Sequence, residues 1–192
     1  ADIAGISRKE AKTVNLGIMY GMGKGKLANQ LSITEKEAEE LLSEHGKNVP
    51  FVKGLADRAS KRAEQAGQIR TLLGRKCRFD LYEPKSFGYK KPLPWKEAME
   101  EYGPLIRRAF TYKALNKLIQ GSAADQTKKA MADCYAEGLL PMLTVHDELC
   151  FSVEGDDQAR RIKDIMENGL SDVLKVPSKV DDELGNNWGE VG

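Results

Sequence analysis

The chain has 192 residues, which is enough for one large core or two small lobes. Hydrophobic residues make up 41% of it and charged residues 31%, as in ordinary soluble globular proteins. The formal net charge of +1 gives no overall field that would draw in DNA or a membrane. No apolar run reaches transmembrane length and no signal-peptide pattern is present, so we expect no membrane contact.

Cysteine usage argues against a zinc knuckle or a disulfide framework. Cys77, Cys134 and Cys150 are widely spaced and odd in number, and no CxxC pair occurs. This pattern fits a reducing compartment such as the cytoplasm. The chain opens on "ADIAGISRKEAK" without an initiator Met, which we interpret as the middle of a longer protein.

The N-terminal half of the sequence predicts helices. Residues 6–20 are a helix candidate that a run of glycines ends. "SITEKEAEELLSEH" predicts a second helix, in which Thr34 and Glu37 form a capping-box pattern. A third helix is predicted over 51–66, where Gly67 supplies a C-terminal cap.

The C-terminal half predicts a mixture of helices and strands. "QIRTLLGRKCRF" predicts a short hairpin around Gly74, and the proline-containing residues 82–95 predict a loop. Pro104 can begin a long helix that runs to about residue 137. A hairpin follows it, then a helix over 157–174 and a last strand over 176–184.

Basic residues gather locally although the whole chain is nearly neutral. Residues 58–78 carry seven cations against one acid, and residues 105–130 carry six against one. Such stripes suit a protein with a polyanion on one face, and they equally suit solvated helix faces. The pattern alone leaves both interpretations open.

The first predicted helix places two cations and two larger side chains along one face. Arg8, Lys12, Leu16 and Tyr20 are spaced four apart, so they drift slowly around the helix while rising about 18 Å. A nucleoside triphosphate needs charge, charge and then a flat apolar contact, in the same order. A surface helix with solvated cations and a buried Leu and Tyr fits the spacing as well.

The long predicted helix carries a pair of amides. Asn116 and Gln120 are four apart and share a face, which Tyr112 extends by one turn. Amides in a basic segment can donate to nucleic-acid edges or phosphates. Bonds to neighbouring backbone would satisfy them equally.

The stretch "PMLTVHDELCFSV" places three ionisable residues between two apolar strands. His146, Asp147 and Glu148 are costly to bury, so a tight turn there would lift a carboxylate out of the sheet. The stretch is either a plain polar turn or an acid presented for use.

Taken in order, these motifs resemble those of the family A DNA polymerases, the bacterial DNA polymerase I class that includes phage enzymes. "RKEAKTVNLGIMYG" has the pattern R-x3-K-x7-Y-G, and "TLLGR", "LNKLIQGSAAD", "VHDEL" and "GNNWGE" follow it. The long segment between Arg78 and Leu105 is more similar to phage members. The resemblance covers nearly the whole chain and implies template-directed DNA polymerisation in a bacterial or phage-infected cytoplasm.

The resemblance implies an α+β fold with two subdomains. Residues 1–105 would form the helical fingers, with the nucleotide-binding helix at 7–20. Residues 106–192 would form the C-terminal part of an antiparallel-sheet palm.

The resemblance also implies roles for residues outside the acidic hairpin. Arg8 and Lys12 would contact the triphosphate of a deoxynucleotide, and Lys12 would also act as general acid to the leaving pyrophosphate. Leu16 would lie against the sugar and base, and Tyr20 would stack near the templating position. The expected contacts with primer–template DNA are Asn116, Gln120 and Arg75.

The acidic hairpin would be the catalytic one. Asp147 would bind Mg²⁺, Glu148 would assist, and His146 would lie near the primer terminus. Two-metal catalysis needs a second bridging carboxylate, which in this family lies upstream of the first helix. We therefore expect a fragment that does not polymerise alone, whose partners include the rest of the polymerase.

Two positions depart from the family pattern. Leu16 stands where Phe or Tyr is usual, which predicts altered discrimination against dideoxynucleotides. Tyr112 stands where bacterial members tend to have Arg, and the neighbouring Lys113 points about 100° away around a helix.

Three alternatives to a DNA polymerase remain open on the sequence. Single-subunit RNA polymerases share a similar helix and acidic hairpin, although Ser usually follows their Asp where this chain has Glu148. A non-catalytic DNA-binding module is the second alternative. An unrelated α+β protein with a polar hairpin is the third.

Overall fold

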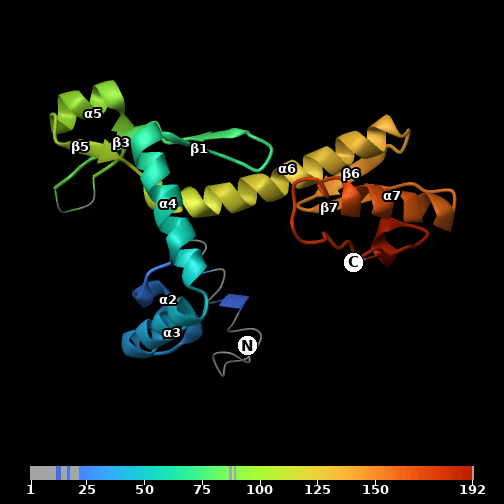
Figure 1. Cartoon of the computed structure of the whole chain (residues 1–192), viewed down its shortest axis with the longest axis horizontal. Helices are drawn as coiled ribbons and strands as arrows, with labels where there is room; N and C mark the ends of the chain where they lie inside the picture. The colour runs from blue at the N-terminus through green and yellow to red at the C-terminus, as the bar shows by residue number, and fades with distance from the viewer. Residues whose placement is uncertain (1–11, 14–16, 18–21, 87, 89, 192) are drawn as a thin grey trace. The chain divides into compact units, whose positions relative to one another are not determined.

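The computed structural model describes residues 12, 13, 17, 22–86, 88 and 90–191, and the chain divides into two compact units (Figure 1). Unit 1 comprises residues 1–120 and unit 2 residues 121–192. Helices combine with small antiparallel sheets, so the expected α+β class is confirmed. The assignment of 1–105 and 106–192 to fingers and palm stays a prediction, because packing defines units and not their roles.

Unit 1 contains three consecutive helices from residue 24 on: α2 (Lys24–Leu31), α3 (Glu35–Asn48) and α4 (Pro50–Ala66). Helices α2 and α3 pack together around Leu27, Ala28 and Ala38. The predicted capping box begins α3, because the Thr34 hydroxyl accepts from the Glu37 N–H at 3.2 Å while the Glu37 carboxylate accepts from the Thr34 N–H at 2.8 Å. Local sequence therefore fixes the start of this helix, as predicted.

A hairpin of β1 (Gln68–Arg70) and β2 (Lys76–Arg78) follows α4. Gly67 ends α4 at a φ of 67°, as predicted for a C-terminal glycine. Ile69 and Phe79 are 5% and 3% exposed, and they form a core with alanines of α4 and with Leu115. The hairpin is therefore packed on one face and open on the other.

The loop predicted over 82–95 is confirmed for its described middle residues, 85, 86, 88 and 90–92, but both of its ends belong to short strands of a small lobe. Its strands and helix are β3 (Leu81–Pro84), β4 (Leu93–Pro94), α5 (Trp95–Tyr102) and β5 (Ile106–Arg108). The sheet order is β4-β3-β5, and α5 packs against β3. Pro84 is the last residue of β3, Pro92 directly precedes the edge strand β4, and Pro94 ends β4 directly before α5, so the prolines lie at the ends of these short strands.

The predicted helix from Pro104 begins ten residues later than expected. Strand β5 and a 3₁₀ turn over Thr111–Lys113 precede helix α6 (Ala114–Ala136), within which the two units meet in sequence. Residues 106–108 pair with β3, more than twenty positions earlier in the chain. Local propensity does not show such a non-local pairing. The predicted helix therefore begins too early, within the residues that form β5 and the 3₁₀ turn.

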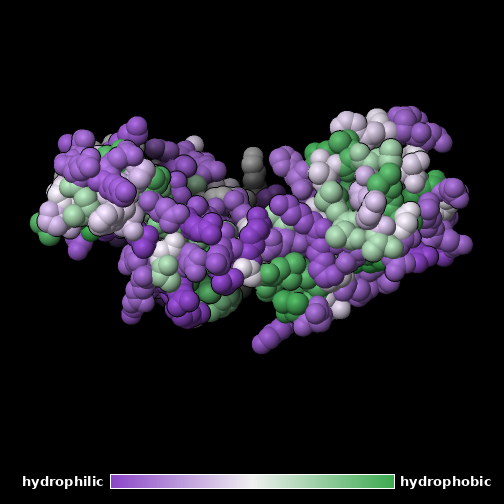
Figure 2. All heavy atoms as spheres, turned by 90° about the horizontal axis from the view of Figure 1, so that it is seen from above, coloured by the Kyte–Doolittle hydropathy of each residue, from purple (hydrophilic) through white to green (hydrophobic). Residues whose placement is uncertain are grey.

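Unit 2 combines the rest of α6 with a hairpin and one further helix. Its elements are β6 (Pro141–Val145), β7 (Glu148–Phe151), α7 (Asp156–Asn168) and a 3₁₀ turn over Trp188–Glu190. Cys134, Leu139 and Ile162 form its core, against which Phe151 and Val153 pack. Figure 2 shows apolar residues on the surface as well, and Met142 is 66% exposed.

The predicted last strand, residues 176–184, is not a strand in the structure. Three of its residues are instead tied to helices: Gln126 donates to Ser178 at 2.6 Å, Val180 N–H donates to Glu167 at 3.0 Å, and Lys163 pairs with Asp182. A strand needs a partner for its backbone groups, and no described strand pairs with this segment.

Candidate functional site

The three ionisable residues of unit 2 lie where β6 turns into β7. Val145 pairs with Glu148, so His146 and Asp147 form a two-residue turn. Glu148 is the first residue of β7 and not part of the turn, which corrects the prediction of three turn residues. The tight turn itself is confirmed, and it places Asp147 at the end of the hairpin.

The turn contains no glycine although its geometry favours one. His146 adopts a φ of 55°, a region that glycine enters freely and that costs other residues about 1–2 kcal/mol. Two-residue hairpins need positive φ to match the twist of their strands. Backbone strain is therefore stored next to Asp147.

The carboxylates of Asp147 in the turn and of Glu148 beside it are available to a ligand. Asp147 and Glu148 are exposed, and in the described structure no hydrogen bond or ion pair engages either carboxylate. Only the backbone carbonyl of Glu148 has a partner, the Thr144 hydroxyl at 3.3 Å. Carboxylate oxygens are the ligands that Mg²⁺ prefers.

The strands of this hairpin are less buried than the sequence predicts. Met142 and Leu143 are 66% and 44% exposed. A register irregularity between Pro141 and Leu143 interrupts the ladder at Met142. Helices of unit 2 cover the Phe151 side of the sheet, whereas no described element covers these two side chains.

The β1–β2 hairpin of unit 1 carries Arg75 at the end of a loop. Thr71 N–H donates to the Arg75 carbonyl at 2.9 Å, and Arg75 N–H donates to the Thr71 hydroxyl at 3.0 Å. Gly74 takes a φ of 85° between them. "TLLGR" is therefore a closed loop that presents an exposed arginine.

Three further cations, which the sequence interpretation left unassigned, lie on the strands of the hairpin that carries Arg75. Arg70 lies opposite Lys76 in the register and Arg78 lies opposite Gln68, and all three cations are exposed. Like charges directly opposite each other destabilise a hairpin. The alternation of cations with the apolar Ile69 was the signal that could have shown this face in advance.

The amide pair lies on α6, with Asn116 half-buried and Gln120 exposed one turn later. Tyr112 does not extend their face, because it belongs to the preceding 3₁₀ turn and is 58% exposed. Lys113 is in the same turn, where its ammonium lies 4.6 Å from the centroid of the Phe110 ring. The comparison of Tyr112 and Lys113 on helical geometry was therefore wrong.

Of the first predicted helix, the structure describes Lys12, Thr13 and Gly17 as helical, with Lys12 exposed. Arg8, Leu16 and Tyr20 lie outside the described residues. Their common face with Lys12 stays a prediction.

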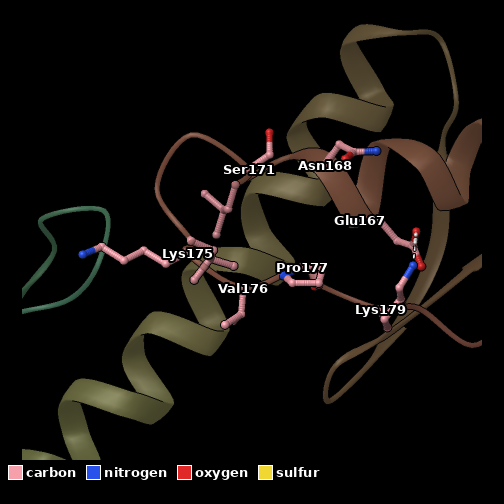
Figure 3. Close-up of a pocket in the computed structure, with 10 residues that line it drawn as sticks. Glu167, Asn168, Ser171, Lys175, Val176, Pro177 and Lys179 are labelled. Atoms are coloured by element: carbon pink, nitrogen blue, oxygen red, sulfur yellow. Dashed lines mark ion pairs between the residues drawn. The ribbon is translucent and has the colours of Figure 1, made fainter.

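A pocket of about 270 Å³ lies beyond the end of α7 (Figure 3). Leu170, Leu174 and Val176 contribute its apolar lining, and the Glu167–Lys179 ion pair, at 3.7 Å, lies beside them. None of the residues predicted for catalysis or binding lines this pocket.

The sequence of the whole chain matches one protein family. The profile described as DNA polymerase family A matches residues 1–190. The chain belongs to DNA polymerase family A. It is 35% identical to a DNA-directed DNA polymerase of Pseudomonas phage M6 over 98% of its length, and 33% identical to DNA polymerase I of Geobacillus stearothermophilus over 97%.

This family A chain spans only 30% of the phage relative and 20% of the Geobacillus relative. Its fold is similar to that of the POL domain of Pol1 from M. smegmatis, solved in complex with DNA primer-template and dNTP. The TM-score is 0.68 at 29% identity, covering 88% of this chain and 28% of that one. The recognition of the family from sequence is confirmed.

The acidic hairpin contains the carboxylates that could hold a metal ion. Among the described residues, no three His, Cys, Asp or Glu side chains group so as to hold a metal ion. Asp147, with exposed and unengaged oxygens, fits Mg²⁺ as one carboxylate ligand. Within the described part of the chain, no helix is long and apolar enough to cross a membrane.

Proposed function

We propose that this chain supplies the nucleotide-binding helix and the acidic turn of a template-directed DNA polymerase. Such an enzyme transfers a nucleotidyl group from a deoxynucleoside triphosphate to the 3′-hydroxyl of a primer. The observation that carries the proposal is an exposed, unengaged Asp147 on a tight turn, in a chain of DNA polymerase family A. Primer–template DNA, deoxynucleotides and further polymerase sequence are the proposed partners.

Asp147 is proposed as the Mg²⁺ ligand, with Glu148 assisting beside it. Mg²⁺ takes one or two protein carboxylates and completes its shell with phosphates and water, so a single turn can supply part of the site. When bound, Mg²⁺ would act as a Lewis acid toward the primer hydroxyl and the phosphates. His146, held at a φ of 55°, would direct its ring toward the primer terminus.

Lys12 is proposed to bind the triphosphate and to move a proton. Its ammonium, exposed on helical backbone, would contact phosphate oxygens and then protonate the oxygen of the leaving pyrophosphate. Arg8 would hold the same phosphates through its planar fork. Leu16 and Tyr20 would flank the sugar, the base and the templating position.

The DNA contacts are proposed on two elements of unit 1. Arg75 would bind the phosphate backbone, since its loop is closed by Thr71 and leaves the guanidinium exposed. Asn116 and Gln120 would reach the primer–template from α6.

The named relatives favour a DNA polymerase over an RNA polymerase. Each of those two relatives is called a DNA polymerase. Because the relatives come from a bacterium and a bacteriophage, we place the activity in the cytoplasm of a bacterial or phage-infected cell.

The test is primer extension by a chimera in which this chain replaces the matching segment of the Geobacillus polymerase. We expect extension, and we expect Asp147→Asn to reduce its rate about 100-fold or more, as when one stabiliser of a transition state is removed. Asp172→Asn makes the same charge change at another exposed position of unit 2, where no described residue forms an ion pair with the carboxylate, and should leave the rate unchanged. A folded chimera that extends primers equally well with Asp147→Asn would contradict the proposal and favour a non-catalytic module.

A further inference from the structure

The connection between β5 and α6 contains a strained residue that the proposed function does not use. Phe110 adopts a φ of 60° and a ψ of 15°, in the left-handed region, where the Cβ of any residue but glycine is crowded. For a bulky side chain this conformation is rare. Such strain persists only where the surroundings over-determine it, and it clusters at functional sites.

Hydrogen bonds fix the backbone on both sides of Phe110. The preceding residue, Ala109, is buried, and its N–H donates to a β3 carbonyl at 2.8 Å. The following residue, Thr111, is held by α4: its carbonyl accepts from the Ser60 hydroxyl at 2.8 Å, and its hydroxyl donates to the Glu64 carboxylate at 3.3 Å. The chain therefore cannot relax at Phe110 without breaking contacts to β3 or α4.

The strained residue carries a lysine on its ring. The Lys113 N–H donates to the Phe110 carbonyl at 2.9 Å, which closes the 3₁₀ turn. The Lys113 ammonium lies 4.6 Å from the centroid of the Phe110 ring and 5.6 Å from that of Tyr112, and both distances suit cation–π attraction. Lys113 is exposed and no described residue forms an ion pair with it, so aromatic rings and not a carboxylate hold its ammonium.

A second lysine near the start of α6 is held in the same way. The Lys117 ammonium lies 5.0 Å from the centroid of the Phe79 ring. Asn116, Lys117 and Gln120 lie within an arc of about 100° around the helix. Lys113 belongs to the turn that leads directly into this helix. The start of α6 therefore combines two lysines on rings with the two amides proposed to contact primer–template DNA.

We propose that Phe110 is a positioning residue, whose strained backbone and ring hold the Lys113 ammonium ready for a phosphate group of bound DNA. A lysine side chain loses rotamer freedom on binding, and one already seated on a ring loses less. An ammonium has three donors, so the ring contact leaves N–H groups for phosphate oxygens. Carboxylates of an acidic protein would satisfy Lys113 but offer no base edges to the amides. The inference rests on the proposed function only in that the phosphate belongs to primer–template DNA.

The test is a double-mutant cycle on affinity, because a residue that acts through another has no effect once the other is gone. It uses the chimera with the Geobacillus polymerase and a fluorescently labelled primer–template. Binding is followed by anisotropy at several salt concentrations, without nucleotide or metal. Phe110→Leu removes the ring and Lys113→Gln removes the charge, and each is made alone and with the other. Phe110→Met is a second variant without a ring, should Phe110→Leu fail to fold.

The two single variants should differ in their salt dependence. Lys113→Gln should weaken binding about tenfold at 0.1 M salt and lower the slope of log affinity against log salt by about 0.9, as for one lost phosphate contact. Phe110→Leu should weaken binding about threefold without changing the slope, because the charge remains and only the cost of ordering it returns. In the Lys113→Gln protein, Phe110→Leu should have no further effect.

Conservative variants and matched controls separate positioning from folding. Phe110→Tyr keeps a ring and Lys113→Arg keeps a cation that stacks on rings, so both should bind nearly as the wild type does. Phe51→Leu removes an exposed ring of α4, and Lys36→Gln removes an exposed lysine of α3. Neither control should change the affinity or its salt dependence.

Equal effects of Phe110→Leu with and without Lys113 would overturn the inference, since the ring would then act through the fold. An unchanged affinity and slope in Lys113→Gln would also overturn it and would indicate a partner other than DNA. Failure of the polymerase proposal is distinguishable, because Asp147→Asn changes nucleotide incorporation and not this binding measured without metal.

Discussion

The β1–β2 and β6–β7 hairpins each contain a residue with a positive φ, but the two loops support that residue differently. In β1–β2, Gly74 takes the positive φ and Thr71 ties the loop to Arg75 with two hydrogen bonds. In β6–β7, the positive φ falls on His146 and the neighbouring Asp147 carboxylate has no described partner. The hairpin proposed to carry the chemistry is thus the one with a strained turn. The other hairpin has a loop closed by hydrogen bonds and packs against a hydrophobic core.

The largest expected effect contrasts the packing of the two hairpins. Phe79 at the end of β2 is 3% exposed, and Leu143 in β6 is 44% exposed. Phe79→Ala should lower the free energy of unfolding by about 3–5 kcal/mol, because a buried ring leaves a cavity. Leu143→Ala should cost less than about 1 kcal/mol. Equal losses in equilibrium urea unfolding would remove the distinction between the hairpins.

A second prediction concerns the glycine that leads into β1. Gly67→Ala should lower the free energy of unfolding by about 2 kcal/mol, because its φ of 67° disfavours a side chain and because the new Cβ meets the Arg108 guanidinium. Gly46→Ala is the control, since this position inside α3 has open space around it. There alanine should stabilise the helix by about 0.5–1 kcal/mol. The same loss at both positions would contradict the account.

At the strained turn of β6–β7, introducing a glycine should raise the free energy of unfolding, whereas removing the glycine at position 67 lowers it. His146→Gly relieves a φ of 55° and should raise the free energy of unfolding by about 1 kcal/mol, while lowering primer extension in the chimera. Thermal unfolding and the extension rate are measured on the same preparation. A less stable variant would show that the His146 conformation is supported by contacts and not strained.

The smallest expected effect is the pH dependence of the stability that Glu37 contributes as a helix cap. The hydrogen bond from the Thr34 backbone N–H, and then that from its hydroxyl, lowers the pKa of Glu37 below its usual value of 4.5. The stabilisation from charged Glu37 is therefore present above that value and is lost as pH falls through the lower pKa of the folded state. We expect the stability difference between the wild type and Glu37→Gln to shrink from about pH 6 to about pH 3. A difference that stays constant with pH would be contrary to this assignment.

The features that sequence predicts correctly here are local ones. Thr34, Glu37 and Gly67 act within a few residues, and each does what its chemistry predicts. The β3–β5 lobe was missed because its strands pair across twenty or more residues, a contact that no local pattern shows. The segment 176–184 was predicted as a strand, yet side-chain bonds to α6 and α7 hold it instead.

The same division applies to the candidate site. The turn at Asp147 follows from acids between two apolar strands, and the structure supplies the exposure of the carboxylate. The positive φ of His146 depends on the register of β6 and β7 and could not be read in advance, whereas the alternation around Ile69 could have shown the cationic face of β1–β2.

The measurement that tests the central claim most directly combines rate and stability for Asp147→Asn in the chimera. We predict that single-nucleotide incorporation falls about 100-fold or more while the free energy of unfolding changes by less than about 0.5 kcal/mol, as expected for an exposed carboxylate without a structural partner. Asp172→Asn should change neither quantity. Unchanged incorporation with Asp147→Asn would contradict a catalytic role for the turn.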